Sequence, residues 1–239
     1  MGTAMGIQAA LRIIYPASCL CCGEIVASDG GLCGPCWRDT PFVTGAVCNL
    51  CGTPLPGEGD DCCDECRMMA PPWSSGRAAM LYDANARRMV LALKHGDRLD
   101  LARPAGKWMA QAAAPILRPG MLVAPVPMYW MRLLRRRYNQ AGLLAQALAR
   151  AAGLDCAPDL LSRTRNTRSQ EGRDRAGRFE NMSGALLVRK PQRVAGRHVL
   201  LVDDVLTTGA TLAAAADACW TAGAADVSVA VLARVTKSP

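Results

Sequence analysis

The sequence predicts an α/β fold with a parallel sheet, preceded by a small cysteine-rich module. A continuous apolar run at 198–202, an alanine-rich segment at 212–221 and a second apolar run at 227–233 follow one another closely. Such a strand–helix–strand unit pairs its two strands in parallel, because a crossover helix joins them. The second observation is that ten of the twelve cysteines lie between Cys19 and Cys66. The chain therefore divides into a cysteine-rich beginning and an α/β remainder.

Length and composition favour a folded protein that keeps its thiols reduced. With 239 residues, 51% of them hydrophobic, the chain can bury a core without disulfides. Its first residues have no basic cluster ahead of an apolar run, so we expect no secretory signal and a cytoplasmic location. No apolar run approaches the roughly 18–20 residues of a membrane-spanning helix, so we expect no membrane insertion.

Four Cys-x-x-Cys pairs repeat along the cysteine-rich part with offsets of 29 or 30 residues. Each pair can form a turn whose two sulfurs face one ion, and two such turns complete a tetrahedral site. We therefore expect about two structural zinc ions, with closed sites that leave no position for catalysis. Cys62 could replace Cys63, and the pairing of the turns stays open. The expected ligands are Cys19, Cys22, Cys33, Cys36, Cys48, Cys51, Cys63 and Cys66.

Charge separates the same two parts. Residues 1–70 carry three basic and eight acidic side chains, whereas residues 71–239 carry twenty-five basic and twelve acidic ones. The excess of basic side chains in residues 71–239 favours binding of phosphate groups, whether of a nucleotide or of a nucleic acid. We expect a zinc-binding module at 15–68 and the α/β domain at 75–239.

The remaining elements follow from local composition. Prolines in 69–72 indicate a linker, and Gly153 is a typical helix stop. The arginine-rich stretch 162–178 has few apolar residues and reads as a mobile surface loop. We expect helices at 6–14, 84–93, 99–117 and 141–152, and strands at 78–82 and 122–124.

The strand at 198–202 leads into a segment suited to a sugar phosphate. Asp203 and Asp204 follow the strand and can accept hydrogen bonds from a sugar diol or hold a hydrated magnesium ion. The next residues are rich in threonine and glycine and precede a helix, whose N-terminal N–H groups favour a phosphate dianion. A phosphate beside a diol describes a ribose 5-phosphate.

This segment resembles the phosphoribosyl-pyrophosphate motif of type I phosphoribosyltransferases, and nearly the whole chain resembles the ComF family of competence proteins. Those proteins carry a double zinc ribbon before a type I phosphoribosyltransferase-like domain. Further matching segments are Leu93-Lys94-His95-Gly96, Ala124-Pro125-Val126-Pro127, Arg136-Arg137-Tyr138-Asn139-Gln140 and Thr167-x-x-Gln170, followed by Arg175, Arg178, Asn181 and Gly184.

The resemblance implies a protein that binds phosphoribosyl pyrophosphate with magnesium and takes part in DNA uptake during natural transformation. Asp203 and Asp204 would be the catalytic pair, orienting the ribose and favouring its developing positive charge. Cationic side chains and magnesium would stabilise the departing pyrophosphate. The implied substrate-binding residues are Val205, Leu206, Thr207, Thr208, Gly209, Ala210, Thr211, Lys94, Arg135, Arg136, Arg137, Arg175 and Arg178.

A second hypothesis is a non-catalytic competence factor that senses a nucleotide, or that binds single-stranded DNA or a DNA-uptake helicase. The arginines of 132–178 supply positive charge, but the stacking aromatics expected for single strands are scarce there. The acidic zinc ribbon favours a protein partner. Arg137-Tyr138 stand where the family commonly has Gly-Phe, which alters the region expected to contact pyrophosphate.

Overall fold

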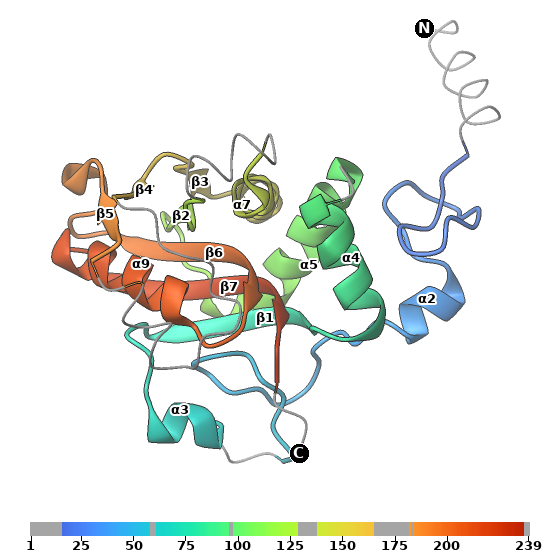
Figure 1. The fold of residues 1–239 in the computed structure, drawn as a ribbon, viewed down its shortest axis with the longest axis horizontal. Helices are drawn as coiled ribbons and strands as arrows, with labels where there is room; N and C mark the ends of the chain where they lie inside the picture. The colour runs from blue at the N-terminus through green and yellow to red at the C-terminus, as the bar shows by residue number, and fades with distance from the viewer. Residues whose placement is uncertain are drawn as a thin grey trace, which may run out of the picture.

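The computed structural model describes residues 16–57, 61–95, 98–128, 138–164, 182 and 184–236. Its centre is a five-stranded sheet in the order β1-β7-β6-β2-β3, with every pair of neighbours parallel (Figure 1). The expected parallel sheet is therefore confirmed. The strands of this sheet are β1 (Ser75–Leu81), β2 (Leu122–Pro125), β3 (Asp155–Cys156), β6 (His198–Leu206) and β7 (Asp226–Arg234).

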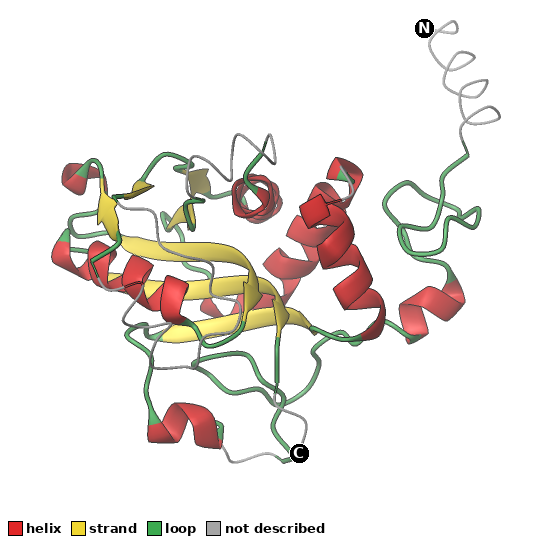
Figure 2. Cartoon of the chain, viewed as in Figure 1, coloured by secondary structure: helices red, strands yellow, loops and turns green. Residues whose placement is uncertain are grey.

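Helices cover both faces of the sheet (Figure 2). The helices α4, α5 and α7 pack on one face, and α9 packs on the other with a small antiparallel sheet of β4 (Leu161–Arg163) and β5 (Leu186–Val188). The α-helices are α2 (Gly34–Arg38), α3 (Asp64–Met68), α4 (Ala84–His95), α5 (Ala102–Ala113), α7 (Gln140–Ala152) and α9 (Ala210–Thr221). Short 3₁₀ turns are η1 (Leu99–Leu101), η2 (Ala114–Ile116) and η3 (Pro191–Arg193).

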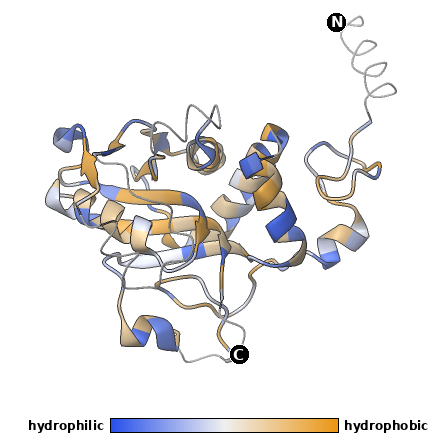
Figure 3. Ribbon diagram, in the orientation of Figure 1, coloured by the Kyte–Doolittle hydropathy of each residue, from blue (hydrophilic) through white to orange (hydrophobic). Residues whose placement is uncertain are grey.

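Both faces of the central strands are buried, which explains their continuous apolar runs. Along β6, Val199 and Leu201 join the core on the α9 side, while Leu200 and Val202 join the core beneath α5 and α7. The hydropathy colouring shows the result, because the central strands are apolar along most of their length (Figure 3). The carboxyl end of β6 is thereby held between two packed layers.

Several expectations need correction. The strand β6 continues to Leu206, so Asp203 and Asp204 lie within it rather than beyond its end. It is extended because β7 continues beside it, pairing Val205 with Ala233. The stretch expected to be a loop at 162–178 begins in β4, which pairs with β5. The rest of that stretch, and the helix expected at 6–14, lie outside the described residues.

The internal repeat of the cysteine-rich part is also a structural repeat. Two isolated antiparallel bridges join Ser18 to Ile25 and Val47 to Pro54, each pair enclosing one Cys-x-x-Cys turn. The other two turns each lead into a one-turn helix, α2 after Cys33 and α3 after Cys63. The cysteine-rich part therefore contains two copies of one structural unit, a bridged turn followed by a short helix.

The second half of this repeat lies along the outer edge of β1. A bridge joins Phe42 to Met80, and the N–H of Gly76 donates to the carbonyl of Asn49 at 2.7 Å. A Cβ on Gly76 would lie 2.2 Å from the Leu50 carbonyl oxygen, so only glycine permits this approach. The first half instead lies near α5, where a Cβ on Gly30 would be 3.1 Å from the ring of Pro104. Among the described helices, none is long and apolar enough to cross a membrane.

Candidate functional site

An acid pair lies near the carboxyl end of β6. The Asp204 N–H donates to Oδ1 of Asp203 at 2.9 Å, and Nζ of Lys94 lies 3.2 Å from Oδ1 of Asp204. Lys94 is in the last turn of α4, so the ion pair joins that helix to the central strand. Both partners of the pair are largely buried, with side-chain exposures of 23% and 14%. The structure therefore brings Lys94, Asp203 and Asp204 together.

Burial, and after it the charge of the neighbouring Asp204, raise the pKa of Asp203 from its usual value to about 7. The Asp204 N–H and the positive charges of Lys94 and Arg163 act in the opposite direction. A carboxyl group with this pKa is only partly ionised at neutral pH, and a hydroxyl-rich or cationic ligand beside it would favour the charged form. This environment fits a polar ligand better than a structural core position.

The β6–α9 loop, residues 207–209, connects the acid strand to α9. Gly209 is the N-cap of the helix and has a φ of 83°, a conformation that favours glycine. A Cβ at this position would lie 3.1 Å from the ring of Trp73. The hydroxyl of Thr208 is buried, and no described residue gives it a hydrogen-bond partner. An unpartnered hydroxyl beside the N-terminus of a helix is suited to an anionic oxygen.

Two groups of four cysteines form the other candidate site. Within each group all sulfurs lie within 4.8 Å of one another. The sulfurs of Cys22 and Cys33 are 3.6 Å apart, as are those of Cys51 and Cys63. That separation is far longer than the ~2.05 Å of a disulfide and close to the ~3.8 Å edge of a tetrahedron with ~2.3 Å zinc–sulfur bonds. The first four-cysteine site comprises Cys19, Cys22, Cys33 and Cys36, and the second comprises Cys48, Cys51, Cys63 and Cys66.

Hydrogen bonds in these groups favour one thiolate in each. Burial alone would raise the pKa of Cys19, but backbone N–H groups of Cys22 and Cys33 lower it to about 6. The hydrogen bond from Cys51 lowers the pKa of Cys48 to about 4 against the effect of burial. Because a thiolate is the form that binds metal, both groups fit zinc chemically as well as geometrically.

Comparisons with known proteins agree with this two-part arrangement. Residues 10–67 match the double zinc ribbon domain, and residues 140–238 match the phosphoribosyl transferase domain. "DNA utilization protein YhgH" of Salmonella typhi is 31% identical over 228 residues, which is 93% of this chain and 99% of that protein. "Competence protein F" of Haemophilus influenzae is 28% identical over 80% of this chain and 85% of that protein. The chain belongs to the ComF family.

Among solved structures, one described as "structure of the allosteric regulatory enzyme of purine biosynthesis" aligns with a TM-score of 0.40 at 20% identity. The alignment covers 59% of this ComF-family chain and 30% of that chain.

The sequence-predicted residues of this ComF-family site fall into three sets. Thr207, Thr208, Gly209 and Thr211 line the β6–α9 loop or open α9, next to the acid pair. The side chains of Leu206 and Ala210 are buried in the core, so these positions offer a ligand only backbone atoms, and Val205 is half-buried. The predicted residues Arg135, Arg136, Arg137, Arg175 and Arg178 lie outside the described residues.

The structure also adds residues that the sequence reasoning missed. Tyr138 donates its hydroxyl to the Leu93 carbonyl at 3.0 Å, and Gln140, which is fully buried, reaches the Lys94 carbonyl at 3.5 Å. Both come from the Arg-Arg-Tyr-Asn-Gln segment and hold the end of α4, from which Lys94 extends. The resemblance to the family had singled out this segment, but it did not indicate that the segment holds the end of α4.

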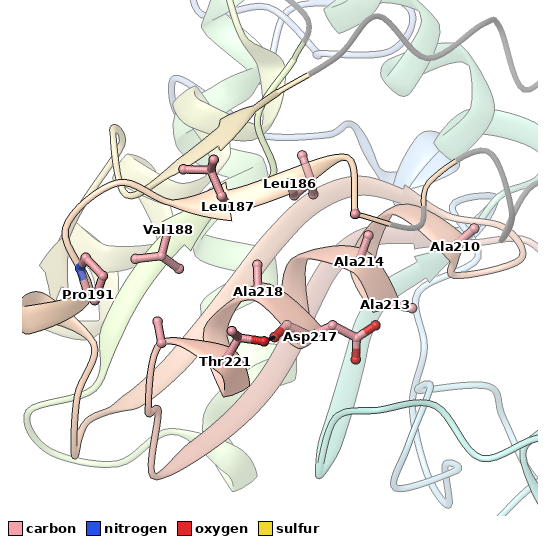
Figure 4. Close-up of a pocket in the computed structure, with 12 residues that line it drawn as sticks. Leu186, Leu187, Val188, Pro191, Ala210, Ala213, Ala214, Asp217, Ala218 and Thr221 are labelled. Atoms are coloured by element: carbon pink, nitrogen blue, oxygen red, sulfur yellow. Dashed lines mark hydrogen bonds between the residues drawn. The ribbon is translucent and has the colours of Figure 1, made fainter.

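A separate, mainly apolar groove lies along α9. It runs between α9 and β5, with a volume of about 690 Å³ (Figure 4). Asp217 is the acid in its lining, and burial raises the pKa of that carboxyl group. No lysine or arginine occurs among the described residues that line the groove, so it is unsuited to a phosphate. None of the residues 207–209 of the β6–α9 loop lines this groove, and the candidate phosphate site is therefore the loop itself.

Proposed function

We propose that this chain binds phosphoribosyl pyrophosphate, or a related ribose phosphate, with magnesium at the carboxyl end of β6. The observation that carries the proposal is the buried acid pair beside a helix N-terminus with an unpartnered Thr208 hydroxyl. Acceptors for sugar hydroxyls and donors for a phosphate lie there in consecutive residues. Membership of a family with a phosphoribosyl transferase domain supports the same substrate class.

In this proposal each residue has a defined task. Asp203 and Asp204 accept hydrogen bonds from the ribose hydroxyls and orient the ring. The hydroxyls of Thr207, Thr208 and Thr211, with the N–H groups that open α9, hold the 5-phosphate. The acid pair would hold magnesium, which neutralises charge on a pyrophosphate group. Lys94 separates from Asp204 when a cation or sugar takes its place, and its ammonium group becomes available to an anionic part of the ligand.

We further propose that the eight cysteines hold two structural zinc ions, one in each four-cysteine site. Four thiolates close each coordination sphere, so the metals stabilise the fold and take no part in group transfer. The boundaries 15–68 and 75–239 remain our division of the chain into a ribbon and a transferase-like domain.

The decisive experiment is calorimetric titration of phosphoribosyl pyrophosphate with magnesium into wild type and an Asp203→Asn/Asp204→Asn double variant. We expect binding by wild type and at least a tenfold loss in the variant, because both ribose-orienting acceptors lose charge. Asp217→Asn is the matched control, since this acid belongs to the same strand–helix unit but lines the separate groove. Equal affinities for wild type and the double variant, or no binding by either, would reject the proposal.

Catalysis is a separate question from binding. Release of pyrophosphate in the presence of a nucleobase or another acceptor would establish transfer at the ribose. Binding without pyrophosphate release from a broad panel of acceptors would instead favour a sensor that retains the ligand site.

A role in DNA uptake is proposed from the relatives, whose names refer to DNA utilization and competence. The second candidate function is therefore binding of single-stranded DNA or of a DNA-uptake helicase. A salt-dependent single-strand binding assay that compares wild type with an Arg135→Ala/Arg136→Ala/Arg137→Ala variant tests it. Loss of the basic cluster should weaken binding and flatten its salt dependence. An unchanged affinity would exclude these arginines as the contact surface.

A further inference from the structure

One buried arginine joins the second four-cysteine site to the β6–α9 loop. Arg234, the last residue of β7, is only 4% exposed. Its Nη1 donates to the carbonyl oxygens of Leu206 and Thr207 at 3.2 and 2.5 Å, and its Nη2 donates to Oε2 of Glu65 at 2.6 Å. Glu65 lies inside the turn Cys63-x-x-Cys66. A single side chain therefore contacts both the backbone entering the loop and a metal-binding turn.

A tryptophan makes a second connection between the same two regions. Trp73 donates its indole N–H to the carbonyl of Leu50 at 2.6 Å, and Leu50 lies inside the turn Cys48-x-x-Cys51. The far edge of the Trp73 ring lies 3.1 Å from where a Cβ on Gly209 would be. Each Cys-x-x-Cys turn of the second site thus has its own contact path to the loop.

The first four-cysteine site is connected elsewhere. Asn85 of α4 donates to the Cys36 carbonyl at 3.3 Å, and Arg98 reaches the Leu20 carbonyl at 3.5 Å. Both contacts lead toward α4 and α5, on the opposite face of the sheet from Trp73. Among the residues that the structure describes, no hydrogen bond or ion pair is recorded from the first site to the loop. The second four-cysteine site can therefore position the β6–α9 loop, whereas the contacts of the first site lead to α4 and α5.

We propose that the second four-cysteine site positions the β6–α9 loop, so that its metal loading raises the affinity of the loop for a phosphoribosyl ligand. Arg234 is the main positioning residue and Trp73 the supporting one. A metal ion bound by these four cysteines would fix the two turns that contain Glu65 and Leu50. Glu65 would then hold Arg234, and the Leu50 carbonyl would hold Trp73. This inference rests on the proposed function, because it names the ligand whose affinity changes.

Coupling between two sites is reciprocal, which gives a readout that a purely structural role would not change. If metal in the second site strengthens ligand binding, bound ligand must strengthen metal binding by the same factor. We expect at least about fivefold, the lower end of typical coupling between sites. The affinity of the second site for zinc, measured by competition with a chelator at equilibrium, should therefore rise by the same factor when phosphoribosyl pyrophosphate and magnesium are present.

Glu65→Gln and Asp64→Asn form a matched pair of full-length variants. Both change one acid in the same Cys-x-x-Cys turn, but Asp64 is 92% exposed and its recorded ion pair is with Arg67. We expect both variants to retain two zinc ions. Glu65→Gln should lower ligand affinity at least about fivefold and abolish the ligand-induced rise in zinc affinity, whereas Asp64→Asn should match wild type. Arg234→Lys, which keeps the charge, should recover part of the affinity that Arg234→Gln loses.

Hydrogen exchange of the backbone amides at 206–209 separates this inference from the proposed function. In ligand-free, zinc-loaded protein, Glu65→Gln should exchange faster there than Asp64→Asn. If wild type binds no phosphoribosyl ligand, the proposed function fails, yet this exchange difference would still support the positioning role. Equal exchange in the two variants, or equal ligand affinity where wild type binds, would overturn the coupling.

Discussion

Replacement of Gly76 by alanine should separate the second four-cysteine site from the sheet. The new Cβ would lie 2.2 Å from the Leu50 carbonyl oxygen and 2.9 Å from a methyl group of Val229. A carbon and an oxygen not bonded to each other need more than 3 Å, so the backbone of one segment must move by about 1 Å. The oxygen belongs to the main chain of a metal-binding turn and cannot be relieved by a change of rotamer.

The expected cost follows from the contacts that this movement breaks. Overpacking of this kind typically costs about 1–3 kcal/mol. The hydrogen bonds from Gly76 to Asn49 and from Trp73 to Leu50 contribute about 1 kcal/mol each. We expect Gly76→Ala to lower the free energy of unfolding by about 3–5 kcal/mol, a large part of the ~5–15 kcal/mol of a typical domain.

Denaturant unfolding of the zinc-loaded protein measures this loss, with zinc release followed in the same titration. The control is Gly57→Ala, because a Cβ at Gly57 meets no atom within 4 Å and Gly57 does not have the positive φ that favours glycine. We expect the control to unfold like wild type within about 0.5 kcal/mol. Equal midpoints for the two variants would refute the close approach of the turn to β1.

Two further predictions concern pH and metal. The pKa of Asp203 is raised from 3.8 to about 7, so the folded protein binds more protons than the unfolded chain between these values. The free energy of unfolding is therefore highest, as far as this group is concerned, below about pH 4. It falls by at most about 4 kcal/mol as the pH rises to about 7. Asp203→Asn should remove this pH dependence in urea titrations between pH 5.5 and 8, whereas Asp155→Asn, at an exposed acid, should keep it. Removing zinc with a chelator should increase hydrogen exchange across 19–66 more than in β2 or β6, because metal binding supplies the folding energy of such turns. Simultaneous loss of protection in both regions would show that they do not fold separately.

Features that depend on local sequence were predictable. The spacing of the cysteines indicated a repeat, and the structure contains it as two bridged turns and two short helices. Gly153 indicated a helix end, and it caps α7 with a φ of 67°. The apolar runs indicated buried strands because both faces of the sheet are covered.

Features that depend on distant partners were not predictable. Arg234 interrupts an apolar run, and the partners that compensate its burial are distant: two carbonyl groups at 206–207 and Glu65, which lies 169 residues away in the sequence. Likewise, the length of β6 is set by pairing with β7 rather than by the composition of β6, which turns acidic at Asp203. The ion pair between Lys94 and Asp204 joins two quoted motifs, but no spacing rule connects them.

The segment at 41–49 has a consequence for how the sheet meets solvent. Its backbone occupies the outer side of β1 through the Phe42–Met80 bridge and the bonds to Ala79 and Gly76. Unpaired strand edges recruit other chains, and natural proteins cover them. A transferase-like fragment cut at residue 75 would present a bare seven-residue strand and tend to self-associate. The segment that leads from the first four-cysteine site into the second is thus also the cover that keeps further strands from adding to this sheet.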